Sequence, residues 1–136
     1  MRFNTLVLSA ALFILGGCAT SPVGNASASP GHQLSNEWQS PGVNTGKLIV
    51  TRDSGFMGAA CSQRIYVDGT PIADLRSGQS VTVYLPAGKH VTGVMSGGMC
   101  GGGSSSAQMT MAAGGTELFR VASGQSGDIK IEPSAF

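Results

Sequence analysis

Short runs of alternating apolar and polar residues follow one another from residue 46 to the end of the chain. Val81, Val83 and Leu85 occupy every second position of one run, and Ile129 and Ile131 do the same in the last. Alternation with a period of two indicates β-strands that bury one face. Eight strands are predicted in this way, over residues 47–52, 63–68, 71–75, 80–85, 89–96, 108–112, 116–122 and 128–132.

Turn residues separate the predicted strands at regular intervals. Asp68-Gly69 is typical of a tight hairpin turn, because glycine accepts the positive φ that such turns require. The sequence Pro-Ala-Gly at 86–88 marks a second turn. No segment beyond the N-terminal apolar run shows the 3.6-residue period of a helix. The pattern therefore predicts an all-β fold over residues 46–136, a small β-sandwich of about 7–8 short strands or a small barrel.

Three segments between Gly46 and His90 read GKLIVTR, IYVDG and LRSGQSVTVYLPAGKH. In this order they resemble the PEGA-type and related small β-domains of uncharacterised bacterial envelope lipoproteins. The matching residues are Tyr66, Val67, Asp68, Gly69, Leu75, Gly78, Leu85, Pro86, Gly88, Lys89 and His90. The resemblance implies a β-sandwich of surface or scaffold type and supplies no catalytic residue. The chain departs from this pattern around Cys61 and after Ser96.

The N-terminus carries an apolar run bounded by a positive charge and a cysteine. Arg2 precedes eleven uncharged residues, 5–15. Eleven helical residues span about 16 Å, half of a ~30 Å hydrocarbon core, so the run indicates a cleaved secretory signal rather than a membrane span. Leu15-Gly16-Gly17-Cys18 follows and resembles the lipobox of bacterial lipoproteins. The resemblance implies that residues 1–17 are removed and that Cys18 is acylated. An ordinary signal with an incidental cysteine is the alternative.

Acylation at Cys18 would make lipid the contact between the mature chain and the membrane. Loss of Arg2 with the signal leaves seven Lys/Arg against seven Asp/Glu, a formal net charge of zero (8 − 1 = 7). No polybasic stretch remains to bind anionic lipid, whereas each buried CH₂ of an acyl chain contributes about 0.8 kcal/mol. Residue 19 is Ala rather than the Asp associated with inner-membrane retention, so the resemblance implies the outer membrane.

Residues 18–45 follow the signal and are rich in Ser, Pro, Gly, Asn and Ala. They show neither the two-residue period of a strand nor the 3.6-residue period of a helix. This composition predicts a flexible tether with a typical reach of about 30 Å. The tether contains Trp38, the only tryptophan of the chain. Trp38 has two interpretations. Its side chain docks against the domain, or it binds a partner. The second interpretation follows from the enrichment of tryptophan at interface hot spots.

Cys61 and Cys100 remain as a pair after acylation of Cys18. An even number of cysteines in an exported domain favours a disulfide. Such a bond would join two glycine-rich loops, 55–60 and 97–106, at one end of the sandwich. Two free thiols and a metal-binding pair are the alternatives.

Composition excludes some classes of function. The 136 residues include 21 glycines and 15 charged side chains (8 Lys/Arg and 7 Asp/Glu), with a formal net charge of +1. No basic stripe is present, so we expect no nucleic-acid partner. Asp68 could orient His90, but no serine is clearly placed to complete a catalytic triad. The glycine-rich loop lacks the lysine of a phosphate-binding loop. No catalytic residue is assigned, no cofactor is expected, and the chain is predicted not to be an enzyme.

The methionines raise an alternative function. Five follow Met1, at Met57, Met95, Met99, Met109 and Met111. Thioethers and thiolates are soft ligands that suit Cu(I). The ordinary role of Met109 and Met111, which share one face of a predicted strand, is to fill the core.

The sequence as a whole favours a membrane-anchored envelope lipoprotein with a non-enzymatic structural or protein-interaction role. Its expected partners are the membrane, through the lipid anchor, and an envelope protein whose identity is open. Sheet edges and the glycine-rich loops are the expected contact surfaces. A periplasmic copper-binding module that uses the Met and Cys cluster is the alternative, and an envelope hydrolase is the third possibility.

Overall fold

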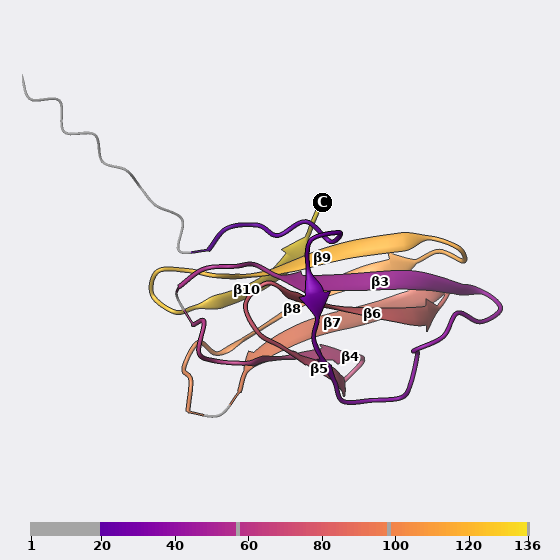
Figure 1. The fold of residues 1–136 in the computed structure, drawn as a ribbon. Helices are drawn as coiled ribbons and strands as arrows, with labels where there is room; N and C mark the ends of the chain where they lie inside the picture. Colours follow the sequence, from indigo (N-terminus) through magenta and orange to yellow (C-terminus); the bar gives the residue numbers. More distant parts are fainter. Residues whose placement is uncertain (1–19, 57, 98, 136) are drawn as a thin grey trace, which may run out of the picture.

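The computed structural model describes residues 20–56, 58–97 and 99–135, which form ten β-strands in two five-stranded sheets (Figure 1). The strands are β1 (Ser29–Pro30), β2 (His32–Gln33), β3 (Thr45–Arg52), β4 (Gln63–Val67), β5 (Thr70–Leu75), β6 (Gln79–Pro86), β7 (Gly88–Ser96), β8 (Ser104–Met111), β9 (Thr116–Ser123) and β10 (Ile129–Pro133). No helix among these residues is long and apolar enough to cross a membrane. The predicted all-β sandwich is confirmed. Signal residues 1–17 and Cys18 lie outside the described residues.

The sheets have the strand orders β1-β6-β3-β9-β10 and β2-β5-β4-β7-β8. At the centre of the first sheet, β3 is antiparallel to β6 and parallel to β9. β6 and β7 belong to different sheets and are separated only by Ala87, where the chain passes from one sheet to the other. On one side of the sandwich the two sheets also meet directly, because the Ile131 N–H donates to Ser105 Oγ at 3.1 Å.

The strand termini gather at two ends of the sandwich (Figure 1). One, here called the disulfide end, carries the loops 54–62 and 97–103. The other, here called the hairpin end, carries the start of β3, the crossing at Ala87 and the turn 112–115 between β8 and β9. A disulfide joins the loops of the first end, whereas short turns join the strands at the second.

All eight strands predicted from alternation are present. Asp68 (φ 49°) and Gly69 (φ 81°) form the predicted tight turn between β4 and β5. The largest difference is at β8, which begins at Ser104 rather than at residue 108. Its first residues are serines without apolar alternation, and they form a strand because they pair with β7, for example Ser105 with Val94.

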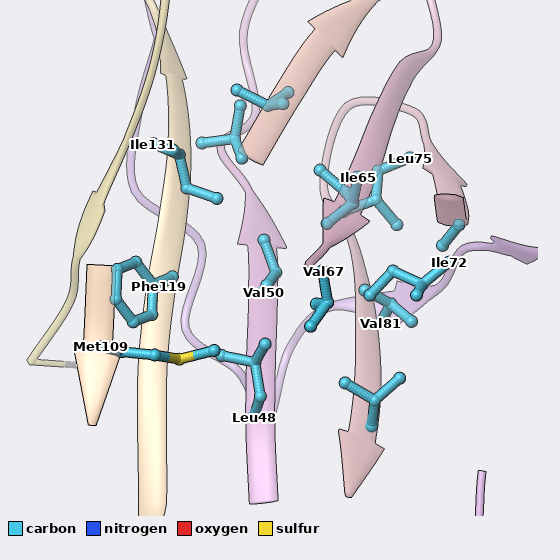
Figure 2. Close-up of a cluster of buried hydrophobic side chains, with 14 of the residues drawn as sticks. Leu48, Val50, Ile65, Val67, Ile72, Leu75, Val81, Met109, Phe119 and Ile131 are labelled. Carbon is cyan, nitrogen blue, oxygen red and sulfur yellow. The ribbon is translucent and has the colours of Figure 1, made fainter. Parts of the chain in front are cut away.

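The core lies between the two sheets. Val81, Val83 and Leu85 are buried, as are Ile129 and Ile131, so the alternation identified the inward faces correctly. Figure 2 shows apolar side chains from strands of both sheets filling this space. Burying such side chains contributes about 1.5–3 kcal/mol each and is the main source of stability.

A short segment at residues 29–33, here called the strap, joins the edges of the two sheets. Its first half, β1, pairs with β6 in the first sheet, and its second half, β2, pairs with β5 in the second. Gly31 makes the crossing, and a Cβ at this position would lie only 2.2 Å from Leu75 Cδ2. Free edges invite pairing with other chains. The strap therefore covers part of the β6 edge of the first sheet and part of the β5 edge of the second. Sheet edges were among the contact surfaces expected from the sequence.

The segment that the sequence predicts as a flexible tether, 18–45, lies against the domain from residue 20 onward. The Ser21 N–H donates to the Ser54 carbonyl at 2.7 Å, and the Ser54 N–H donates to the Ser21 carbonyl at 3.0 Å. The strap and Trp38 continue this attachment. Residues 20–38 are therefore attached to the two sheets at several points. Two-residue strands leave no periodicity in a Ser, Pro and Gly sequence, so the pattern could not predict them.

Trp38 docks against the domain, as one of its two interpretations predicted. Its side chain is half-buried and packs against the core. Its carbonyl accepts a hydrogen bond from the Tyr84 N–H at 2.8 Å, which attaches this part of the chain to the open edge of β6.

Candidate functional site

Cys61 and Cys100 form the disulfide that joins the two loops of the disulfide end. Their Cα atoms lie 6.1 Å apart, a normal separation for this bond. The Gly97 N–H also donates to the Ser62 carbonyl at 3.0 Å, which places the second loop beside the first. The predicted pairing is confirmed. Neither sulfur is then a thiolate that could act as a nucleophile or bind a metal.

Arg52, the last residue of β3, is buried beneath these loops. Its guanidinium donates to the carbonyls of Leu75 at 2.9 Å and Gly58 at 2.6 Å, and to that of Cys61. Burial lowers the pKa of Arg52. Because β3 and Leu75 belong to different sheets, this side chain ties both sheets and the loop 54–62 together, using the several donors of one planar group.

Asp53 is the buried carboxylate next to Arg52. Its Oδ2 lies 2.9 Å from Arg120 Nη2 and accepts a hydrogen bond from Thr20 Oγ1 at 3.4 Å. Burial raises the pKa of Asp53, and the charge of Arg120 and the Thr20 hydrogen bond oppose this effect. This carboxylate therefore connects the segment that contains Thr20 to the end of β3 and to β9.

The loops above this polar layer present apolar side chains to solvent. Phe56 is 93% exposed and Met99 is fully exposed. Neither loop 54–62 nor loop 97–103 contains a charged residue. Phe56 and Met99 are therefore available for contacts outside the domain.

His90 and Asp68 meet toward the hairpin end, as the sequence allowed. His90 Nδ1 lies 2.6 Å from Asp68 Oδ2, and His90 Nε2 lies 2.7 Å from the Pro86 carbonyl oxygen. Asp68 Oδ1 accepts the Val91 N–H at 2.9 Å. Partial burial acts to lower the pKa of His90, but the hydrogen bonds to Asp68 and Pro86 and the carboxylate charge outweigh it and raise this pKa.

This arrangement favours a structural role for His90. Both ring nitrogens face oxygen acceptors, so the protonated ring can donate on both sides. A general base needs a ring nitrogen whose lone pair points at the substrate proton. Neither nitrogen of His90 is free for that task. The histidine instead connects the β4–β5 turn with the end of β6.

A shallow hollow runs along β7 on the outer face of the second sheet. Its volume is about 300 Å³, Gly93 is one of its lining residues, and it adjoins a second hollow of about 440 Å³ lined in part by His90. The first hollow is lined by Tyr66, Gly69, Val91, Gly93, Val94, Met95, Ser104, Ser105 and Ser106. Apolar, aromatic and hydroxyl groups lie together here, and both hollows are shallow.

Four of the methionines that could supply copper ligands lie among the described residues. Met109 and Met111 are buried in the core, which confirms their ordinary role. Met95 is half-exposed on β7, and Met99 is fully exposed on the loop 97–103. Met57 lies outside the described residues. Within residues 20–56, 58–97 and 99–135, no three His, Cys, Asp or Glu side chains are placed to hold a metal ion.

No known protein family and no curated protein matches this chain.

Sequence reasoning missed the buried polar layer of Arg52 and Asp53. The run 47–52 is predicted as a strand, but the pattern does not predict that Thr51, Arg52 and Asp53 are buried one after another. Two adjacent opposite charges at the end of the strand were the available signal. They resemble an ordinary solvated strand end, so only the surrounding loops reveal their role.

Proposed function

We propose that this protein is an exported lipoprotein, acylated at Cys18 and held at the outer membrane, whose domain has a non-enzymatic structural or protein-interaction role. The observation that carries the proposal is the lipobox-like Leu15-Gly16-Gly17-Cys18 after a short uncharged run. Ser21, three positions after Cys18, is already hydrogen-bonded to Ser54 of the domain.

The disulfide supports an exported location. Disulfides persist in oxidising compartments such as the bacterial periplasm and the cell surface, and they are rare in the cytosol. The Cys61–Cys100 bond also separates the roles of the three cysteines. Cys18 alone is left for acylation.

The side chains that a hydrolase would use support the non-enzymatic role. The Cys100 sulfur is bonded to Cys61, and both ring nitrogens of His90 are hydrogen-bonded. The two residues belong to opposite parts of the fold, since Cys100 lies at the disulfide end and His90 near the hairpin end. The resemblance to scaffold-type envelope domains points in the same direction.

The proposal is tested by acylation and fractionation of the full chain. We expect the chain expressed in a Gram-negative bacterium to incorporate a palmitate analogue and to sediment with the outer membrane. The matched control is Cys18→Ser, which should lose both the label and the membrane association. Cys61→Ser/Cys100→Ser should retain the label. Equal labelling of wild type and Cys18→Ser would contradict the proposal.

The non-enzymatic role is tested separately. Purified domain is assayed against ester, peptide and glycan substrates, alongside His90→Gln and Cys100→Ser. We expect no turnover above that of the two variants. A hydrolytic rate that disappears in either variant would contradict this part of the proposal while leaving the anchor in place.

A further inference from the structure

We propose that the disulfide end of the domain faces and touches the lipid bilayer, with Phe56 and Met99 entering its interfacial layer. The inference rests on the proposed acylation of Cys18. It goes beyond that proposal because it fixes which surface meets the membrane, and it replaces the long tether expected from the sequence with a close, oriented attachment.

The first step is the length of chain between the anchor and the domain. Only Ala19 separates Cys18 from Thr20, so the two positions are two steps apart in the sequence, and an extended chain spans at most about 3.3–3.6 Å per step. The Cα atoms of Cys18 and Thr20 therefore lie within about 7 Å of each other. Thr20 is hydrogen-bonded to Asp53, and Ser21 is held by Ser54 through two backbone hydrogen bonds. An acylated Cys18 holds this end of the domain at the membrane surface.

The second step is the position of the exposed apolar side chains relative to that point. Phe56 follows Ser54 by two residues, so it lies on the loop to which the incoming chain is bonded. Met99 precedes Cys100, and Cys100 is bonded to Cys61 on the loop that contains Phe56. Figure 1 shows both loops at the end of the sandwich where the described chain begins.

The third step is charge. The two loops contain no charged residue, and the turns beside them carry one exposed cation, Arg76, and one exposed anion, Asp128. An uncharged loop can approach lipid without the penalty of burying an ion. Aromatic and thioether side chains fit the region between headgroups and hydrocarbon. At the opposite end, Val43 is equally exposed (94%) but lies far from the anchor.

The main experiment measures which end of the acylated chain meets lipid. Acylated full chain, its acyl groups verified by intact mass, is placed in phosphatidylethanolamine–phosphatidylglycerol vesicles that contain brominated lipid. Phe56→Trp and its matched control Val43→Trp are compared, each in a Trp38→Phe background. Bromine quenches tryptophan fluorescence only at short range. We expect several-fold stronger quenching for Phe56→Trp.

A second measurement uses the native sequence and does not depend on the folding of these variants. Exposed methionine thioethers are oxidised to sulfoxides by dilute peroxide in water. On vesicles we expect Met99 of the acylated chain to oxidise several-fold more slowly than in the Cys18→Ser chain beside the same vesicles. Met95, which is half-exposed near the end of β7, should be protected less than Met99, and the buried Met111 should oxidise slowly in both chains.

The outcomes separate this inference from the proposed function. If the chain is acylated but quenching is equal at both positions and Met99 is not protected, the proposed membrane contact is wrong. The proposed acylation of Cys18 is then unaffected. Protection of Met99 in whole envelopes but not in protein-free vesicles assigns the surface to a protein partner and also overturns it. Absence of acyl groups overturns both proposals.

Discussion

The two ends of the sandwich are held by different interactions. At the disulfide end, the loops 54–62 and 97–103 are fixed by a covalent bond, by the buried guanidinium of Arg52 and by the Asp53–Arg120 pair. At the hairpin end, strands turn directly into one another, and the backbone comes so close that a Cβ on Gly46 would lie 2.5 Å from the Ala112 carbonyl oxygen.

This difference follows from the number of backbone hydrogen bonds that each end can form. Strand pairing satisfies the backbone at the hairpin end almost to the last residue, so small side chains and tight turns are sufficient. The disulfide-end loops have little regular pairing, and their buried carbonyls need other donors. Arg52 supplies these donors. The disulfide and Arg52 hold these two loops from the inside, so the outer surface of the loops is available for other contacts.

Removal of the disulfide should have the largest effect. The bond closes a loop across a sequence separation of 39 residues. The chain-entropy relation gives about 4 kcal/mol for a loop of this length. We therefore expect Cys61→Ser/Cys100→Ser to lower the free energy of unfolding by roughly this amount, measured by urea denaturation without reductant.

Reduction of the wild-type protein is the control for this prediction. The reduced wild type should unfold at the same urea concentration as the double variant, because both lack only the cross-link. A double variant as stable as the oxidised protein would mean that hydrogen bonds alone hold the two loops, and the contrast between the ends would disappear.

Arg52→Met should produce the next largest loss. The substitution keeps an unbranched apolar stem but leaves three carbonyls without their donor, and each such buried acceptor costs about 1–3 kcal/mol. Since water can reach part of the site, we expect a total loss of about 3 kcal/mol. Urea denaturation measures the loss, and hydrogen exchange should show it first in residues 54–62.

Arg64→Met is the matched control for Arg52. Arg64 makes two good hydrogen bonds to Asp74, at 2.8 and 2.9 Å, but it is exposed at the surface of the second sheet. Exposed ion pairs contribute little to stability. Equal losses in the two variants would show that burial of Arg52 does not set its importance.

Gly46→Ala tests the hairpin end by addition rather than removal. The new methyl group would meet Met111 Sδ at 2.3 Å and the Ala112 carbonyl oxygen at 2.5 Å. Met111 can move, but the backbone oxygen moves only with its strand. We expect a loss of about 2 kcal/mol from overpacking. Gly42→Ala, whose nearest neighbour would be Thr45 Cγ2 at 3.4 Å, should unfold like the wild type. A Gly46→Ala variant of unchanged stability would show that this end has spare room.

The strands were predictable because each buries one face. Alternation in β6 and β10 identified both the element and its inward residues, and Asp68-Gly69 identified a turn. The strap was not predictable, because its strands have two residues each and owe their conformation to the edges they cover. The start of β8 is a strand for the same reason, since its serines pair with β7.

The site was predictable only where a covalent bond defines it. Two cysteines in an exported chain indicate a disulfide whatever the fold. Arg52 and Asp53 gave no comparable signal, because the burial of a charge depends on loops that are distant in the sequence. The contact of the segment 18–45 with the domain was also not predictable, because the hydrogen bonds between Ser21 and Ser54 join residues 33 positions apart in an aperiodic sequence.

The smallest effect is expected at His90, and it depends on pH. The pKa of His90 is raised in the folded protein above its ordinary value of 6.5, so the folded state binds the proton more tightly than the unfolded state. The stabilisation is complete below pH 6.5 and is lost as the pH rises through the folded pKa. Asp68 is 41% exposed, so we expect less than about 1 kcal/mol. Urea denaturation of wild type and His90→Gln between pH 6 and pH 9 measures this difference. If the stability of His90→Gln depended on pH as that of the wild type does, the ion pair would not be among the interactions that hold this end.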